Sequence, residues 1–181
     1  MNGQVIILNG VSSSGKTTLA KAIQKYSTDI WLHVAMDNFI AMLPDGSEFD
    51  REWFPVTEVE RDGTTLPHIG NGPAGESLLG QMRQLVQNLA EAGFNVLVDD
   101  VAEATEIADY RRRLGTSCVA VKVDAPLDEL ECRESERGDR VIGLAREQSA
   151  RVHKGIEYDL EVDTLHETPD ALARYVLNSI P

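Results

Sequence analysis

A glycine-rich segment near the start of the chain constrains the fold more than any other feature of the sequence. The segment follows a short apolar run and precedes a stretch with helical spacing of its apolar residues. It matches the pattern G-x-x-x-x-G-K-[ST] at every fixed position, which is typical of a phosphate-binding loop (P-loop) between a strand and a helix. The residues of this loop are Gly10, Val11, Ser12, Ser13, Ser14, Gly15, Lys16 and Thr17.

The fixed residues of the loop have distinct roles toward a nucleoside triphosphate. Gly10 and Gly15 allow backbone conformations that turn successive N–H groups inward around phosphate. The N-terminus of the following helix adds positive potential at the same place. Lys16 can reach the β- and γ-phosphates, and the Thr17 hydroxyl can bind Mg²⁺. We therefore expect the whole loop to bind ATP, with Mg²⁺ as the cofactor.

The rest of the chain alternates apolar runs with longer amphipathic segments. Strands are predicted at residues 4–9, 31–36, 95–99, 117–123 and 158–162. Helices are predicted at residues 15–26, 38–43, 76–92, 103–114, 127–136, 141–152 and 168–179. This alternation predicts an α/β fold with a five-stranded parallel sheet that is flanked by helices on both faces. We expect residues 1–181 to form one domain.

One segment, residues 44–75, interrupts the alternation and is expected to be an irregular insertion. It holds four of the seven prolines and five of the fourteen glycines, and its Asp62-Gly63 pair is typical of a hairpin turn. Insertions of this length in a compact domain are usually functional or mobile. We expect its aromatic residues to form a wall of the pocket for a phosphate acceptor; the alternative is a surface excursion. These residues are Phe49, Trp53 and Phe54.

Two acidic residues, Asp99 and Asp100, end the third predicted strand. A P-loop requires an acid at the end of a neighbouring strand to hold Mg²⁺ through water. Asp99 directly follows the apolar run, so we expect it, together with Thr17, on the metal side. Asp100 would point to the opposite face, toward the acceptor, or cap the next helix. Helix capping alone is the alternative for the pair.

Three arginines, Arg133, Arg137 and Arg140, cluster around Gly138. Arg133 and Arg137 lie four residues apart and share a helix face. We expect a closing lid at about residues 133–141, in which Arg133 and Arg140 bind the nucleotide. Arg137 would stabilise the transferring phosphoryl group. The alternative is surface ion pairing with Glu129, Glu134 or Glu136, which contributes little stability.

Asp37 stands where the second predicted strand gives way to a helix. This position is typical of a helix N-cap. It also lies just past a strand C-terminus, where ligands bind in parallel sheets. A carboxylate there could take the proton of an acceptor hydroxyl as its oxygen attacks the γ-phosphorus. We expect Asp37 and Lys16 to be catalytic together with Arg137.

The net charge of the chain limits its partners. The sequence contains 17 Lys and Arg residues against 30 Asp and Glu residues, which gives a formal net charge of −13. Such a surface repels nucleic-acid backbones and anionic membranes. No basic N-terminal region, long apolar run or cysteine motif is present, so a cytoplasmic protein is expected. The expected ATP site gathers its cations into a locally basic cleft.

Several longer stretches resemble the chloramphenicol phosphotransferases over nearly the full length of the chain. They are residues 6–10 before the loop, Trp31-Leu32 before Asp37, residues 98–101, residues 137–143 and residues 153–164. The last two stretches are much more specific than the loop itself, which many ATPases share. The match is loose over residues 41–73, the segment expected to shape the acceptor pocket.

This resemblance implies a nucleoside-monophosphate-kinase-like P-loop fold and a kinase activity. The family moves the ATP γ-phosphate to the primary hydroxyl of chloramphenicol and so confers antibiotic resistance. Its catalytic base, loop lysine and Mg²⁺-binding hydroxyl fall on Asp37, Lys16 and Thr17. The expected partner is therefore a small-molecule alcohol, most simply chloramphenicol. The alternatives are another acceptor (a nucleotide, a sugar or a peptidoglycan precursor) and a nucleotide-dependent regulatory switch, although the Asn-Lys-x-Asp and Asp-x-x-Gly motifs of GTPases are absent.

Overall fold

The centre of the molecule is a parallel sheet of five strands. A computed structural model describes residues 2–138 and 141–180. The strands follow the order β2-β5-β1-β6-β7, and all four neighbouring pairs are parallel. The predicted α/β architecture with five parallel strands is therefore confirmed. The strands are β1 (Val5–Asn9), β2 (Trp31–Ala35), β5 (Asn95–Asp100), β6 (Cys118–Asp124) and β7 (Leu160–Asp163).

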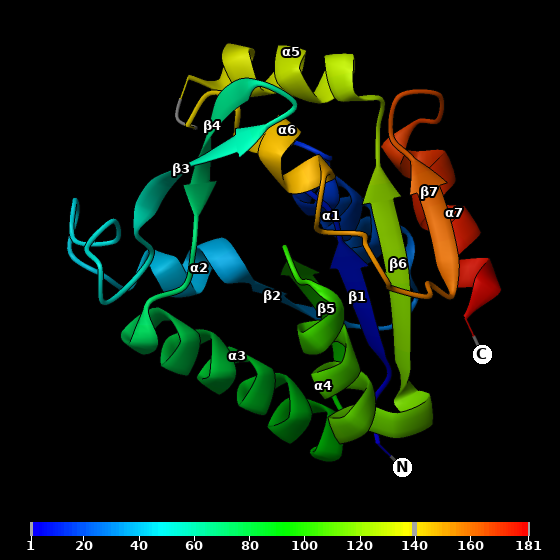
Figure 1. Cartoon of the computed structure of the whole chain (residues 1–181). Helices are drawn as coiled ribbons and strands as arrows, with labels where there is room; N and C mark the ends of the chain where they lie inside the picture. Colours follow the sequence, from blue (N-terminus) through cyan, green and yellow to red (C-terminus); the bar gives the residue numbers. More distant parts are fainter. Residues whose placement is uncertain (1, 139–140, 181) are drawn as a thin grey trace.

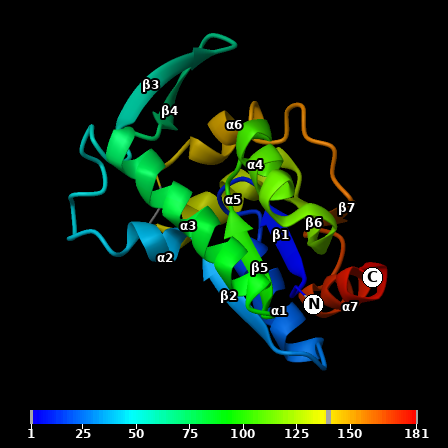
Figure 2. The same cartoon turned by 90° about the horizontal axis from the view of Figure 1, so that it is seen from below.

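Helices cover both faces of this sheet (Figures 1 and 2). Strand β1 lies in the middle, and its side chains alternate between two apolar clusters. Val5 and Ile7 pack on the face with α3 (Pro73–Glu91) and α4 (Ala104–Leu114). Ile6 and Leu8 pack on the face with α1 (Lys16–Tyr26) and α7 (Pro169–Ser179). Burial on both faces explains why β1 is apolar throughout instead of alternating with polar residues.

The shorter elements gather toward the carboxyl ends of the strands, which point up in Figure 1. There α2 (Met36–Ile40) follows β2 directly, and α5 (Leu127–Arg137) lies beside α6 (Leu144–Ser149). A 3₁₀ turn (Gly115–Ser117) connects α4 to β6 at the opposite end. In parallel sheets, ligands bind outside the carboxyl ends of the strands. The arrangement therefore places the loop of residues 10–17 where a ligand is expected.

The segment of residues 44–75 is more regular than its composition suggested. Strands β3 (Val56–Arg61) and β4 (Thr64–Ile69) pair antiparallel as a hairpin that projects from the body (Figure 2). Asp62 and Gly63 form its turn with φ angles of 49° and 75°, as the Asp-Gly pair predicted. Helix α3 then begins at Pro73, three residues earlier than expected, because proline suits the first turn of a helix.

The helix predicted at residues 141–152 is shorter in the structure. Helix α6 begins after Gly143, whose φ of 91° is left-handed and incompatible with a continuous helix. A series of turns follows it to Gly155. Of the described residues, no helix is both long and apolar enough to cross a membrane.

Candidate active site

A cavity of about 1040 Å³ opens at the carboxyl end of the sheet. The sequence-predicted residues on its wall are Ser12, Ser13, Ser14, Gly15, Lys16, Thr17, Asp37, Asp99, Asp100, Arg133 and Arg137. Gly10 and Val11 belong to the loop but are not among the lining residues. Arg140 lies outside the described residues. One cavity thus joins the phosphate loop, the expected base and two arginines of the expected lid, although 121 positions separate Lys16 from Arg137.

The loop has the backbone conformation that its glycines predicted. Gly15 adopts a φ of 93°, which favours glycine, and Ser13 also lies in the left-handed region with a φ of 65°. Gly10 is required for a different reason. A Cβ atom at this position would lie 2.2 Å from the carbonyl oxygen of Val123 on β6. The loop can therefore pack this closely against the sheet only with glycine there.

The polar groups of the loop suit an anion. The Lys16 ammonium donates to the carbonyl oxygens of Gly10 at 2.9 Å and Val11 at 3.0 Å, which keeps it over the loop. The buried hydroxyls of Ser12, Ser13 and Ser14 have no hydrogen-bond partner in residues 2–138 and 141–180. Buried polar groups are normally paired, so unpartnered hydroxyls around a cationic loop fit the oxygens of a phosphate chain.

Asp99 and Thr17 meet at the base of the loop. The Thr17 hydroxyl donates to Asp99 Oδ2 at 2.6 Å, and Lys16 Nζ lies 3.9 Å from Asp99 Oδ1. The imidazole of His33 on β2 approaches the same carboxylate at 3.6 Å. Burial alone raises the pKa of Asp99, but these neighbours outweigh it and hold that pKa below its usual value. Asp99 therefore presents an ionised carboxylate beside a hydroxyl, and both are oxygen groups of the kind that Mg²⁺ prefers.

Asp100 points to the other face of β5 and is held by different partners. Its Oδ2 accepts from the Tyr110 hydroxyl at 3.0 Å, and its Oδ1 accepts from the backbone N–H of Val101 at 2.8 Å. Burial raises the pKa of this carboxyl. Asp100 does not cap the next helix, because Glu103 and Glu106 form the capping box of α4. The capping alternative for Asp100 is therefore wrong, and its carboxyl belongs to the cavity wall.

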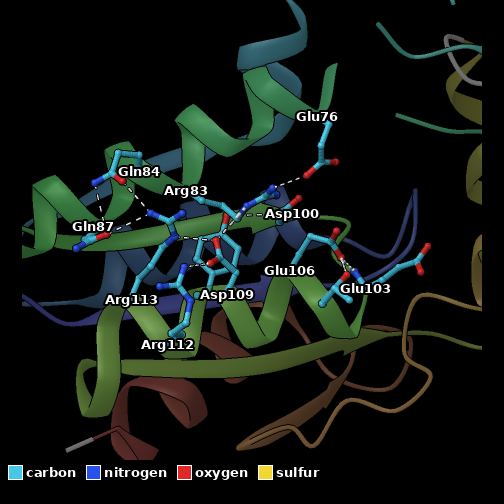
Figure 3. Close-up of polar contacts among 12 residues, drawn as sticks. Glu76, Arg83, Gln84, Gln87, Asp100, Glu103, Glu106, Asp109, Arg112 and Arg113 are labelled. Carbon is cyan, nitrogen blue, oxygen red and sulfur yellow. Dashed lines mark hydrogen bonds and ion pairs between the residues drawn. The ribbon is translucent and has the colours of Figure 1, made fainter. Parts of the chain in front are cut away.

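A polar network that the sequence did not reveal supports this wall (Figure 3). Arg83 is buried in the middle of α3 and lines the cavity. Its guanidinium donates to Glu76 at 2.9 Å and lies 3.6 Å from Asp109 of α4. Asp109 in turn accepts from Arg113, so α3 and α4 are linked by charge. No local pattern indicates the contact between Arg83 and Asp109, because these two residues come from separate helices.

Asp37 is the second residue of α2 and lines the cavity with an exposed side chain. The N-cap residue of this short helix is Ala35, and no side-chain cap bond forms there within the described residues. Asp37 therefore does not cap α2 as its sequence position suggested. An exposed carboxylate on a cavity wall near a phosphate loop has the access that a general base needs.

Arg133 forms the ion pair that was considered as its alternative role, and it also contacts a residue that touches the phosphate loop. Its Nε pairs with Glu129 at 2.7 Å, as in a surface ion pair. Its Nη1 and Nη2 donate to the Thr164 hydroxyl at 2.9 Å and the Thr164 carbonyl oxygen at 3.1 Å. The Thr164 hydroxyl donates to the Ser14 carbonyl oxygen at 2.9 Å. Arg133 is thus connected to the phosphate loop through one side chain.

Arg137 is the last residue of α5 and lines the cavity. Gly138 follows it in the left-handed conformation, with a φ of 67°, and ends the helix. Arg137 therefore stands at the C-terminal end of α5, within the expected lid of residues 133–141. This position suits an arginine that approaches the nucleotide from the lid side.

The opposite part of the cavity carries more apolar groups. Two of the three aromatics expected there, Phe49 and Phe54, line it, whereas Trp53 does not. Other lining residues on this side are Met36, Ile40, Leu43, His68, Ile69 and Leu79. Helix α2, the segment that follows it, strand β4 and helix α3 thus supply a wall of mixed aromatic and aliphatic character, which is typical of a small-molecule pocket.

Solved structures place this architecture among the P-loop kinases. An APS kinase of Mycobacterium tuberculosis in complex with AMPPNP and APS matches with a TM-score of 0.68 and 19% identity, over 98% of this chain and 97% of that one. A sugar kinase from Janibacter sp. HTCC2649 matches with a TM-score of 0.69 and 20% identity, over 97% and 93%. A shikimate kinase from Acinetobacter baumannii in complex with shikimate matches with a TM-score of 0.60 and 15% identity, over 97% and 92%.

The chain belongs to the chloramphenicol phosphotransferase-like family, whose model matches residues 3–181. A protein of Mycobacterium tuberculosis that is named as a candidate O-phosphotransferase is 32% identical over 179 residues, which cover 95% of this chain and 80% of the relative. The suspected resemblance is therefore confirmed. Family and fold together define a small-molecule O-phosphotransferase with a P-loop for its nucleotide.

Proposed function

We propose that this protein transfers the γ-phosphate of ATP to an alcohol hydroxyl of a small molecule, and that chloramphenicol is the acceptor. The single observation that carries the proposal is the shared cavity. The phosphate loop, Asp37 and Arg137 open into one space that also has an apolar wall. Family membership favours chloramphenicol within the class of alcohols. With ATP as donor, the activity belongs in the cytoplasm.

The proposed reaction is an in-line displacement at the γ-phosphorus. The acceptor oxygen forms a bond to phosphorus while its proton passes to the Asp37 carboxylate. The bond from phosphorus to the β,γ-bridging oxygen breaks, and ADP leaves with that electron pair. Lys16 neutralises charge on the β- and γ-oxygens, and Arg137 neutralises charge on the transferring group. Arg133, which is connected to Ser14 through Thr164, helps to hold the nucleotide in the phosphate loop.

Mg²⁺ fits the residues at the base of the loop. The Thr17 hydroxyl and the ionised Asp99 carboxylate are adjacent oxygen donors. No cluster of three or more His, Cys, Asp or Glu that could hold a metal occurs in the described part of the chain. This agrees with the usual mode for Mg²⁺, which relies on one or two protein ligands plus substrate phosphates and water. When bound, Mg²⁺ would neutralise charge between the β- and γ-phosphates.

The experiment is a comparison of ADP release from ATP and Mg²⁺ with and without a panel of alcohols. The panel contains chloramphenicol, a nucleoside monophosphate, a hexose and a muramyl sugar. We expect ADP release that depends on an alcohol and is greatest with chloramphenicol. Preference for another alcohol would show that chloramphenicol is not the acceptor, while the assignment of the protein as a kinase would stand. Slow release that responds to none of them would favour the regulatory switch.

A further inference from the structure

A glutamine of α6 contacts the phosphate loop. Gln148 lines the cavity and is 7% exposed. Its Oε1 accepts the backbone N–H of Ser12 at 2.6 Å, a contact between residues 136 positions apart. The side chain therefore stands directly on the loop that the nucleotide is expected to occupy.

The contact with Ser12 fixes which way the amide of Gln148 points. A backbone N–H can only donate, so the atom facing Ser12 must be the carbonyl oxygen of the glutamine. The amide nitrogen Nε2, with two N–H donors, then points away from the Ser12 nitrogen. Within residues 2–138 and 141–180 the side chain of Gln148 makes one hydrogen bond, the one from Ser12 to Oε1, so Nε2 has no partner there. Gln148 thus offers unused donors at the wall of the cavity.

The position of Lys16 identifies the part of the nucleotide that would meet these donors. Lys16 Nζ lies on the carbonyl oxygens of Gly10 and Val11, the two residues before Ser12. The lysine of this motif contacts the β- and γ-phosphates. The Ser12 end of the loop is therefore its γ-phosphate end, and Gln148 stands beside it.

Helix α6 is fixed on both of its sides, which keeps Gln148 in place. The buried carboxylate of Glu134 on α5 accepts from the backbone N–H groups of Gly143 at 2.7 Å and Ala145 at 2.8 Å. Glu147, also buried, contacts His68 Nδ1 of β4 at 3.0 Å and Arg151 Nε at 2.9 Å. A donor held this firmly needs no reorganisation during transfer, which is the condition for strong electrostatic stabilisation.

We propose that Gln148 is a further catalytic residue, whose Nε2 donates a hydrogen bond to an oxygen of the γ-phosphoryl group. This inference rests on the proposed use of ATP and is independent of the acceptor. The bond places a fixed donor on the oxygens over which negative charge is spread during transfer, and glutamine contributes it without a proton changing hands. Oε1 remains on Ser12 throughout, so one side chain aligns the loop and binds the group that moves.

The test compares the affinities for AMPPNP and ADP in Mg²⁺ by calorimetry for the wild type, Gln148→Glu and Gln148→Met. Gln148→Glu keeps an oxygen for the Ser12 N–H but lacks the Nε2 donors. Gln148→Met lacks both contacts and adds no charge, so it excludes simple repulsion as the cause. We expect both variants to lose about tenfold or more in AMPPNP affinity relative to ADP affinity, as for a bond to a charged group.

Gln81→Glu, on the exposed face of α3, makes the same change of charge away from the cavity and should keep the wild-type ratio. Thermal unfolding of each variant checks that the chain is folded. An unchanged ratio of AMPPNP to ADP affinity in both Gln148 variants would overturn the inference and leave the proposed function standing. A wild type that binds neither nucleotide would overturn both.

Discussion

Thr17 Oγ1 donates a hydrogen bond of 2.6 Å to Asp99 Oδ2, and this bond joins the phosphate loop to the carboxyl end of β5. The two residues lie 82 positions apart and come together because β5 is the direct neighbour of β1 in the sheet. Lys16 lies on the other carboxylate oxygen at 3.9 Å. Strand order thus places an acid beside the loop, where a divalent ion bound to phosphate would stand.

The Thr17–Asp99 pair predicts how nucleotide binding depends on Mg²⁺. Thr17→Ala and Asp99→Asn should reduce the gain in ATP affinity that Mg²⁺ provides, because the first removes the hydroxyl and the second removes the negative charge that would hold the ion. Thr17→Ser keeps the hydroxyl and should behave as the wild type. Calorimetric titration with ATP, in Mg²⁺ and in EDTA, measures the gain. A full Mg²⁺ effect in both loss variants would place the metal elsewhere.

Lys16→Ala should abolish phosphoryl transfer whichever alcohol is the acceptor. The substitution removes the cation that holds the β- and γ-phosphates and leaves the glycines of the loop in place. Circular dichroism and thermal unfolding show whether the variant is folded, since Lys16 also binds the carbonyl oxygens of Gly10 and Val11. Activity retained by a folded variant would contradict the assignment of the loop.

Asp37→Asn should lower kcat by roughly 10²–10⁴-fold, the usual contribution of a general base, and leave ATP affinity nearly unchanged. The asparagine keeps the shape of the side chain on α2 but cannot take a proton. Asp29→Asn, an exposed change before β2, is the matched control and should have no effect. Steady-state kinetics with saturating acceptor give kcat. A variant with wild-type kcat would exclude Asp37 as the base.

Arg133 and Arg137 are the two arginines of the expected lid that the structure describes. Substituting them should have different effects on ATP binding and on kcat. Arg133→Ala should weaken ATP binding, because Arg133 supports the loop through Thr164. Arg133→Lys should not restore it, since an ammonium cannot make the paired contacts of the guanidinium. Arg137→Ala should mainly lower kcat, by about 10³-fold if it acts as an arginine finger. Equal effects of Arg133→Ala and Arg137→Ala on kcat and KM would contradict this division.

The two cysteines should differ in reactivity. Burial raises the pKa of Cys118 to about 12, so its thiolate is scarce near neutral pH. Cys132 is exposed, and the nearby Glu136 carboxylate raises its pKa. A disulfide reagent at about pH 8 should therefore modify one thiol per native chain, more slowly than free cysteine. Adding denaturant should expose the second. Rapid reaction of both thiols in the native chain would contradict the burial of Cys118.

Local patterns in the sequence were sufficient for the sheet and for most of the catalytic candidates. Strand β1 and the loop after it are recognisable because an apolar run, two glycines and a lysine are close in sequence. The hairpin turn was visible at Asp62 and Gly63 for the same reason. The start of α6 was not, since the left-handed Gly143 has no distinctive neighbours.

Residues whose roles depend on distant partners could not be found in this way. Gln148 is an uncharged residue in a polar helix, and only the packing of α6 against the loop gives it a role. From the sequence alone, Arg83 is an ordinary helical arginine. Its role depends on Asp109 of α4, which lies beside it in the structure. The sequence suggested Asp37 and Asp100 as possible helix caps. In the structure Glu103 and Glu106 form the capping box of α4, and no side chain caps α2 within the described residues. The roles of these residues depend on contacts between separate helices and strands. The local spacing of residues in the sequence does not encode such contacts.

Identifying the product of the reaction tests the proposed function most directly. Phosphorus NMR of a reaction with ATP, Mg²⁺ and chloramphenicol follows the γ-phosphate itself and does not rely on ADP alone. We expect a phosphomonoester of the chloramphenicol primary hydroxyl, formed in equal amount to ADP. If the γ-phosphate appeared only as inorganic phosphate, with chloramphenicol and with every other alcohol, the protein would not be the phosphotransferase that its cavity and its family indicate.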